Sequence, residues 1–255
     1  ATQNFTTATD VYNVAVGYFA GNAITTSQYN TLIGGLAGDA LTTGNENTAL
    51  GVGALGTETA GDRNVAVGNG ALTTQNITGG GDIFNTAVGY FAGAAVTTGI
   101  QNTLIGGAAG DALTDADYNV GLGTGALSAD TLGSKSTAIG TNTLHYQNFT
   151  TATDTFNTAV GYNAGLVVTT GTQNTLIGGL AGDALTTGSL NVAVGYGALS
   201  TDDLGSQSVA IGRNALGAQN YATATNSVNT AIGYEAGLSI TTGIANTLVG
   251  GQAGD

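Results

Sequence analysis

Two pairs of neighbouring carboxylates are the residues of this sequence best suited to acid–base chemistry: Asp115 with Asp117, and Asp202 with Asp203. Glycoside hydrolases use such a pair, with one carboxyl group as general acid and the other as base or nucleophile. Neither pair has a recurring aromatic sugar platform or a basic partner beside it. We therefore interpret both pairs as surface acids that keep the protein soluble, and we predict no catalytic residues.

Asp39, Asp111 and Asp183 recur at a fixed interval and are weak candidates for a metal site. Calcium takes six to eight oxygen ligands, and one carboxylate per repeat supplies few of them unless several chains converge. Solvated turns are the better interpretation. His145 stands alone as a surface or turn histidine, and the glycine-rich turns lack the lysine of a phosphate-binding loop. No cofactor is expected.

The charge balance excludes several classes of partner. Three basic residues face sixteen acidic ones, for a net charge of −13, whereas a nucleic-acid binder needs a basic face. The same balance disfavours docking on anionic membranes, and no segment is apolar enough for insertion into one. The absence of cysteine excludes disulfides, thiolate metal sites and a cysteine nucleophile.

A short repeated motif must position all of these residues. It reads Asn or Ser, Val or Thr, a third residue, an aliphatic residue and Gly, and successive copies are 17, 17, 17 and then 21 residues apart, which makes a super-repeat of 72. We number each coil from its Asn or Ser, position 0, and call residues at one position of successive coils a column. The copies begin at Asn13, Asn30, Asn47, Asn64, Asn85, Asn102, Asn119, Ser136, Asn157, Asn174, Asn191, Ser208, Asn229 and Asn246. The super-repeats are 13–84, 85–156, 157–228 and a partial 229–255, and 1–12 is interpreted as the end of a preceding long coil, so we expect a piece of a longer protein.

The pattern inside each coil is that of a strand followed by turns. Positions +1 and +3 are apolar or Thr and share one face, and position +4 is always Gly. A 17-residue coil cannot fold alone, even if Val14, Val16 and Phe19 each contribute about 2 kcal/mol on burial. The coils must therefore stack. The sequence predicts an all-β protein: one parallel β-solenoid, or β-roll, over 13–255, with every fourth coil lengthened. The core is lean in large side chains, which favours a parallel homotrimer.

Particular segments resemble known fibre proteins. SVAIG from Ser208 and STAIG from Ser136 are similar to head repeats of trimeric autotransporter adhesins, and NTAVGYFAG from Asn85 with NTLIGG from Asn102 resembles repeats of phage tail fibre proteins. The resemblance implies a trimeric β-roll on an extracellular or virion surface. We expect a non-catalytic structural segment, foremost of a phage tail fibre involved in host attachment, with a host-surface receptor or glycan as a further partner. A bacterial surface adhesin or extracellular filament is the alternative.

A function of another class, ice binding, is suggested by recurring threonine pairs. A flat, regular threonine array on a β-solenoid resembles hyperactive antifreeze proteins, but here the array skips coils. The pairs lie at 25–26, 42–43, 97–98, 169–170, 186–187 and 241–242.

The long coils, the Asn column and the Tyr column each carry a prediction about where their side chains lie. Four extra residues cannot stay in a stacked wall, so 73–84, 145–156 and 217–228 are predicted to form outward loops that carry any lateral contacts. Asn76 and Asn148 lie there in Asn-x-Thr sequons, and Asn4 lies in another at the end of the preceding long coil, all as possible glycosylation or contact sites. The Asn column is either an inward ladder or a row of turn formers. Tyr18, Tyr90, Tyr162 and Tyr234 are expected to stack along the side of the solenoid, with receptor or sugar contact as the alternative.

Overall fold

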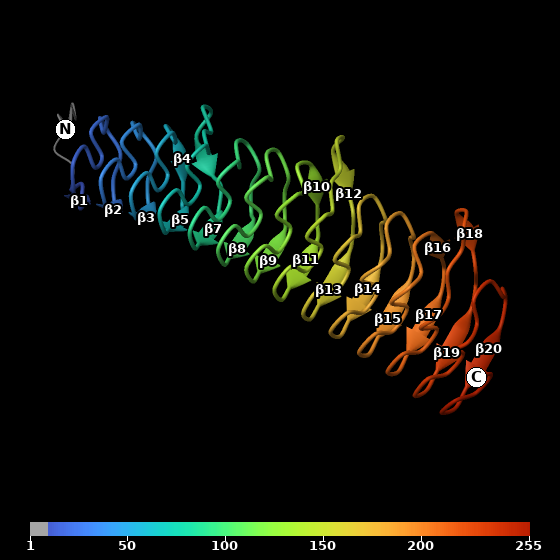
Figure 1. Cartoon of the computed structure of the whole chain (residues 1–255). Coiled ribbons are helices and arrows are strands. Elements are labelled where there is room, and N and C mark those ends of the chain that lie inside the picture. The colour runs from blue at the N-terminus through green and yellow to red at the C-terminus, as the bar shows by residue number, and fades with distance from the viewer. Residues whose placement is uncertain (1–9) are drawn as a thin grey trace. The chain divides into compact units, whose positions relative to one another are not determined.

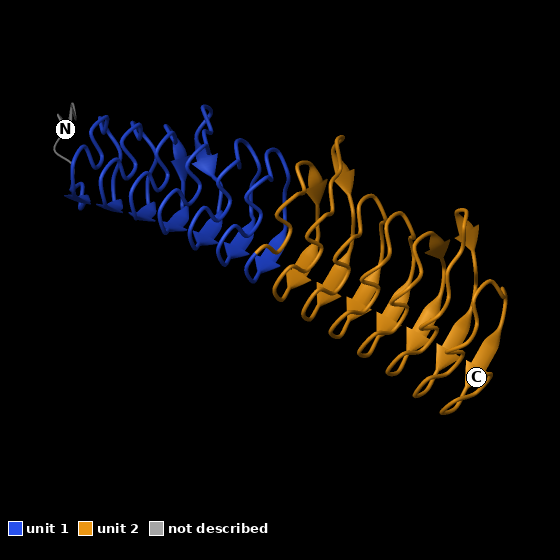
Figure 2. Ribbon diagram, viewed as in Figure 1, with its two compact units in different colours: residues 1–124 blue, residues 125–255 orange. Residues whose placement is uncertain are grey.

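The computed structural model describes residues 10–255, and this part of the chain is all-β with no helix (Figure 1). Two compact units, residues 1–124 and 125–255, make up the chain (Figure 2). Each unit is a parallel β-solenoid with one three-residue strand per coil, and the two together comprise about fourteen turns. The predicted fold class is thereby confirmed, while a single solenoid body over 13–255 stays a prediction. Because residues 10–255 contain no helix, none there is long and apolar enough to cross a membrane.

The main sheet of each unit consists of seven parallel strands. In the first unit these are β1 (Val14–Val16), β2 (Thr31–Ile33), β3 (Thr48–Leu50), β5 (Val65–Val67), β7 (Thr86–Val88), β8 (Thr103–Ile105) and β9 (Val120–Leu122). In the second unit they are β11 (Thr137–Ile139), β13 (Thr158–Val160), β14 (Thr175–Ile177), β15 (Val192–Val194), β17 (Val209–Ile211), β19 (Thr230–Ile232) and β20 (Thr247–Val249).

The register of these strands confirms the 17- and 21-residue rhythm. Val14 pairs with Thr31, 17 residues later, whereas Val65 pairs with Thr86, 21 residues later. The backbone hydrogen bonds that join coils continue well beyond the strands, as where the amide of Gly38 donates to the carbonyl of Ala54 (3.0 Å). Each coil is therefore held to the next around much of its circumference, which explains the absence of proline.

Each long coil protrudes, as predicted, but over a shorter segment than the predicted loops 73–84, 145–156 and 217–228, because the ends of those loops stay in the wall. These segments form tips, seen in Figure 1 at β12, at β18 and at the unlabelled teal arrow beside β4, which is β6. Residues 78–82, 150–154 and 222–226 in these tips are mostly exposed. The walls on either side stay regular, because Gln75 and Ile83 flank the first tip and are both buried. Short two-stranded parallel sheets connect each tip to the preceding coil: β4 (Gly61–Asp62) with β6 (Gly81–Asp82), β10 (Gly133–Ser134) with β12 (Thr153–Asp154), and β16 (Gly205–Ser206) with β18 (Thr225–Asn226).

The core is built mainly from small residues fitted to one another. Position +2 is buried in nearly every coil, as Ala in most and as Leu in the second coil of each super-repeat. Where Leu32 fills the interior from +2, position +8 is Gly38, and a Cβ there would lie 2.8 Å from the Leu32 side chain. Where +2 is Ala49, position +8 is the fully buried Leu55. In these coils a large side chain on one wall thus faces a small residue on the other, so the two walls fit together across the interior.

The expectation that Val14, Val16 and Phe19 are core residues is wrong. These side chains are 47%, 56% and 48% exposed, and the +1 and +3 columns point outward all along both units. The physical reason is the short distance between opposite walls, which leaves room for Ala or an occasional Leu at +2 but not for a full set of β-branched side chains.

The invariant Gly at +4 has a steric explanation. Gly34 has a φ of +136°, a conformation that L side chains rarely adopt, and a Cβ there would lie 2.4 Å from the carbonyl oxygen of Gly51 in the next coil. The turn therefore closes only if this column contains no side chain.

Candidate functional site

The outer face of the main sheets is the most extensive candidate functional surface. We define it as the outward columns −1, +1, +3 and +5. Column +3 provides one Val, Ile or Leu per coil, which is half-buried or exposed throughout the described residues. The tyrosines at +5 project further, with Tyr18, Tyr90, Tyr162 and Tyr234 between 51% and 74% exposed. An aliphatic stripe bordered by aromatic residues is thus open to solvent on each unit.

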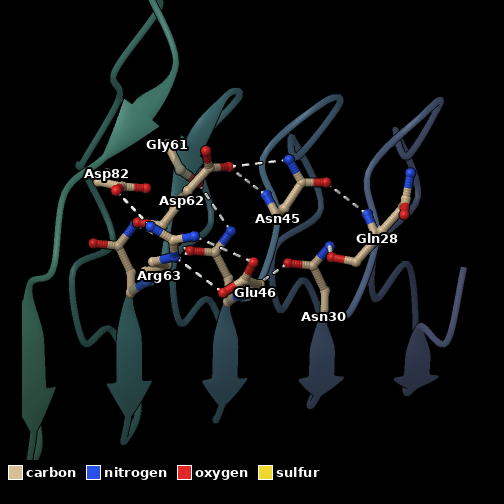
Figure 3. A network of polar contacts seen from close by, with 10 residues as sticks. Gln28, Asn30, Asn45, Glu46, Gly61, Asp62, Arg63 and Asp82 are labelled. Carbon is tan, nitrogen blue, oxygen red and sulfur yellow. Dashed lines mark hydrogen bonds and ion pairs between the residues drawn. The ribbon is translucent and has the colours of Figure 1, made fainter.

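Polar contacts at the −1 edge of this face centre on Arg63 (Figure 3). Its guanidinium lies between Glu46 of the preceding coil, at 3.0 Å from Nε to Oε2, and Asp82 of the following tip, and it stacks 5.7 Å from the ring of Phe84. The hydrogen bond from Arg63 and its positive charge lower the pKa of the Glu46 carboxyl. Because these groups are exposed, the contacts position the side chains more than they stabilise the fold.

All three basic residues of the sequence make the same kind of contact. Each flanks the fourth strand of a super-repeat, pairs with an acid and lies over an aromatic ring in the coil that follows. The sets are Arg63 with Asp82 and Phe84, Lys135 with Asp154 and Phe156, and Arg213 with Glu235 and Tyr234. We call these sets clasps, since each one ties a long coil to a neighbouring coil: Arg63 and Lys135 join it to the coil before, and Arg213 joins it to the coil after.

The Asn column is an inward ladder, which settles the alternative left open by the sequence. Asn174 is fully buried, and its Oδ1 accepts a hydrogen bond from the backbone amide of Asn191 in the next coil (3.0 Å). Its Nδ2 donates to the carbonyl of Gly188, at the end of its own coil (2.8 Å). Asn174 therefore closes its own coil and joins it to the next.

A buried carboxylate organises every long coil, and sequence reasoning missed it. Glu58, in the coil before the first tip, accepts hydrogen bonds from the amides of Gly61 (2.8 Å) and Ile77 (3.1 Å) and from Nε2 of Gln75 (2.9 Å). Because a carboxylate only accepts, the Gln75 amide must turn its oxygen toward Asn85, whose Nδ2 donates to it (2.8 Å). The acid thus orients the amides at the start of the next super-repeat.

The same network recurs with Asp130, Gln147 and Asn157, and with Asp202, Gln219 and Asn229. The interpretation of Asp202 as a surface acid is therefore wrong: its side chain is fully buried, and burial raises the pKa of its carboxyl. Asp203 points the other way and accepts a hydrogen bond from Thr186. The signal in the sequence is column +11, which reads apolar, apolar, acid and Gln in each complete super-repeat.

The other candidate residues are dispersed. Asp115 accepts a hydrogen bond from Thr98 (2.6 Å) and Asp117 from the amide of Ile100 (2.8 Å), so each carboxylate binds the preceding coil. His145 lies half-buried in a turn, with Nδ1 3.0 Å from Oγ of Ser128. Residues 10–255 contain no group of three or more His, Cys, Asp or Glu side chains arranged to hold a metal ion, and no enclosed pocket.

The three metal candidates do not come together within a unit. Asp39 and Asp111 are half-buried and separated by four strand spacings, or about 19 Å. At Asp183, burial raises the pKa of the carboxyl. Convergence of these columns between several chains stays a prediction.

The sequons lie in the wall and not on the protruding tips, contrary to expectation. Asn76 is half-buried, and its Oδ1 accepts a hydrogen bond from Thr59 (2.8 Å). Asn148 is exposed and accepts one from Thr131 (3.1 Å). Both residues occupy column +12, where most coils have Thr, so they belong to the regular wall. Asn4 lies outside the described residues, and glycosylation stays a prediction.

Column +12 also contains the first threonine of each recurring pair. Thr42 donates its hydroxyl proton to the carbonyl of Thr59 (2.9 Å), and Thr25, Thr97 and Thr169 make the equivalent bond. Because the proton of each hydroxyl group is donated within the wall, these hydroxyl groups can only accept hydrogen bonds from solvent.

Comparisons with protein-family models, curated proteins and solved structures find no match.

Proposed function

We propose that this chain is a non-catalytic structural segment of an extracellular or virion fibre, foremost a phage tail fibre that acts in host attachment, and that it assembles as a parallel homotrimer. The observation that carries the proposal is the outer face. Monomeric soluble proteins rarely expose a contiguous apolar patch of more than a few hundred Å², and larger patches mark interaction sites. Here an aliphatic side chain faces outward in every coil.

The regular spacing of this face favours a second copy of the chain as the partner. Successive outward aliphatic residues lie one strand spacing apart, about 4.8 Å. Only a partner with the same axial repeat can pack against these side chains in register over many coils. Another copy of this chain necessarily has that repeat. The small residues of the core add a second argument, because association would bury apolar surface that a single chain cannot cover.

The chemistry of the remaining side chains supports a structural role. The buried acids Glu58 and Asp202 orient neighbouring amides, and the exposed Asp115 binds the preceding coil. These groups stabilise the stack of coils.

Charged substitutions on the outer face test the proposed assembly. Val88→Lys combined with Ile105→Lys places two ammonium groups in column +3, and Thr43→Lys places one on an exposed position outside that face. We expect the double variant to retain the β circular dichroism spectrum and to sediment as a monomer, while Thr43→Lys assembles like the parent chain. Unchanged assembly of the double variant would contradict the proposed interface.

The resemblance of the Ser136 and Ser208 segments to adhesin head repeats favours a bacterial surface adhesin as the second candidate. Electron microscopy with an antibody against the chain separates the two. Labelled fibres on virions support the tail fibre, whereas label on bacterial surfaces supports the adhesin.

A further inference from the structure

At one edge of the outer face, a protruding tyrosine is followed one coil later by a bare backbone position in every super-repeat. In column +5, the first coil of each super-repeat has Tyr and the second has Gly. The pairs are Tyr18 with Gly35, Tyr90 with Gly107, Tyr162 with Gly179, and Tyr234 with Gly251. All four tyrosines are exposed.

These glycines have no evident role within their own chain. Gly106, one residue earlier, needs to be glycine because its φ is +138° and a Cβ would lie 2.5 Å from the backbone of Gly123. Gly107 has no left-handed φ, and a Cβ there would meet nothing within 4 Å. At Gly35 the nearest atom would be the Tyr18 carbonyl oxygen, at 3.9 Å. Alanine would fit both positions and would lower the conformational entropy lost on folding, so a glycine there suggests close approach of another molecule.

The third super-repeat indicates what occupies such a position. There the ring of Tyr196, from the following coil, lies 3.5 Å from the place of a Cβ on Gly179. A phenol ring of the chain itself thus covers this glycine. The following coil has Val52 or Thr124 at the corresponding position in the first two super-repeats, and no ring covers Gly35 or Gly107.

We propose that the open positions at Gly35 and Gly107 receive tyrosine rings from a second copy of this chain, so that the Tyr–Gly pair of each super-repeat fixes the axial register of the assembly. The tyrosines and the glycines share the 72-residue super-repeat, or about 19 Å along the sheet. A parallel copy in the same register presents Tyr18 and Tyr90 one strand spacing from these glycines. Tyrosine supplies a large, rigid contact at protein interfaces.

This inference rests on the proposed assembly, and filling the glycine positions tests it. In the full chain, Gly35→Leu with Gly107→Leu occupies both gaps, while Gly79→Leu is the matched control, because a Cβ at Gly79 also meets nothing within 4 Å but lies on the first tip. We expect the double variant to retain its β spectrum and to associate at least tenfold more weakly, with the control unchanged. Undiminished association of the double variant would overturn the inference.

Cross-linking tests the register without relying on a bulky substitution. Because the chain contains no cysteine, Tyr90→Cys and Gly107→Cys can be prepared as separate variants, refolded together and oxidised. A disulfide requires Cα atoms within about 7 Å, so the expected product is a covalent dimer with one chain of each kind. Asn69→Cys, one coil away in the same column, replaces Tyr90→Cys as the control and should cross-link poorly to Gly107→Cys.

The outcomes distinguish this inference from the function on which it rests. A parent chain that remains monomeric would overturn both. A trimer that cross-links equally well through Asn69→Cys would overturn the register alone. Normal assembly of the leucine variants, combined with loss of binding to a glycan array, would assign the Tyr–Gly positions to a sugar and overturn the inference.

Discussion

Replacement of one Asn of the inward ladder tests how the coils hold together. In Asn174→Ala, the backbone amide of Asn191 and the carbonyl of Gly188 both lose their side-chain partner, and both residues are buried. An unsatisfied buried polar group costs about 1–3 kcal/mol, so the two together predict a loss of about 2–6 kcal/mol in the free energy of unfolding. Urea unfolding followed by circular dichroism measures this loss at a fixed protein concentration.

Two further variants make the result specific. Gln173→Ala removes the neighbouring exposed amide and should change the free energy of unfolding by less than about 0.5 kcal/mol. Asn174→Ser should fall between the two, because a serine hydroxyl can accept from the Asn191 amide but is too short to reach Gly188. Hydrogen exchange at the Asn191 amide should accelerate in Asn174→Ala. If Asn174→Ala is no more destabilising than Gln173→Ala, the ladder does not join the coils as described.

Three other substitutions probe the backbone and the buried acid. Gly106→Ala combines a φ of +138° with a Cβ 2.5 Å from Gly123, so we expect loss of several kcal/mol or failure to fold, seen as a lower thermal midpoint. Gln101→Gly relieves an exposed left-handed residue with a φ of 57° and should raise the free energy of unfolding by up to about 1 kcal/mol; a decrease would contradict that reasoning. Burial raises the pKa of Asp202 above its usual 3.8, opposed by hydrogen bonds from Gln219 and Gly205, so its contribution to stability is fully present below pH 3.8 and is lost as the pH rises through the raised value. Urea unfolding from pH 3 to pH 7 should therefore show a downward slope that Asp202→Asn reduces, and an equal slope in both proteins would refute this assignment.

The repeat was predictable because it depends on local steric rules. Gly at +4 is forced by a close contact with the next coil, and the spacing of this residue reports the length of each coil directly. The choice of the buried face was not predictable from alternation alone. Alternation separates Val16 and its column from Ala49 and its column but does not say which face points inward, and here the distance between opposite walls decides in favour of the smaller residues.

The buried acids show a second limit of sequence reasoning. Asp202 and Asp203 are adjacent and look alike, yet Asp202 is fully buried while Asp203 is half-buried and accepts a hydrogen bond from Thr186. Only alignment of the coils reveals that Asp202 shares a column with Glu58 and Asp130, each followed one coil later by Gln. The same alignment of coils places the aliphatic +3 column on the outer face once +2 is known to be the inward column.

The central claim is that the outer face joins copies of this chain, and the mass of the protein in solution tests it most directly. Sedimentation equilibrium of the full chain at micromolar concentration should give the mass of three chains of 24.8 kDa each. A single-chain mass that persists as the concentration rises would contradict the account.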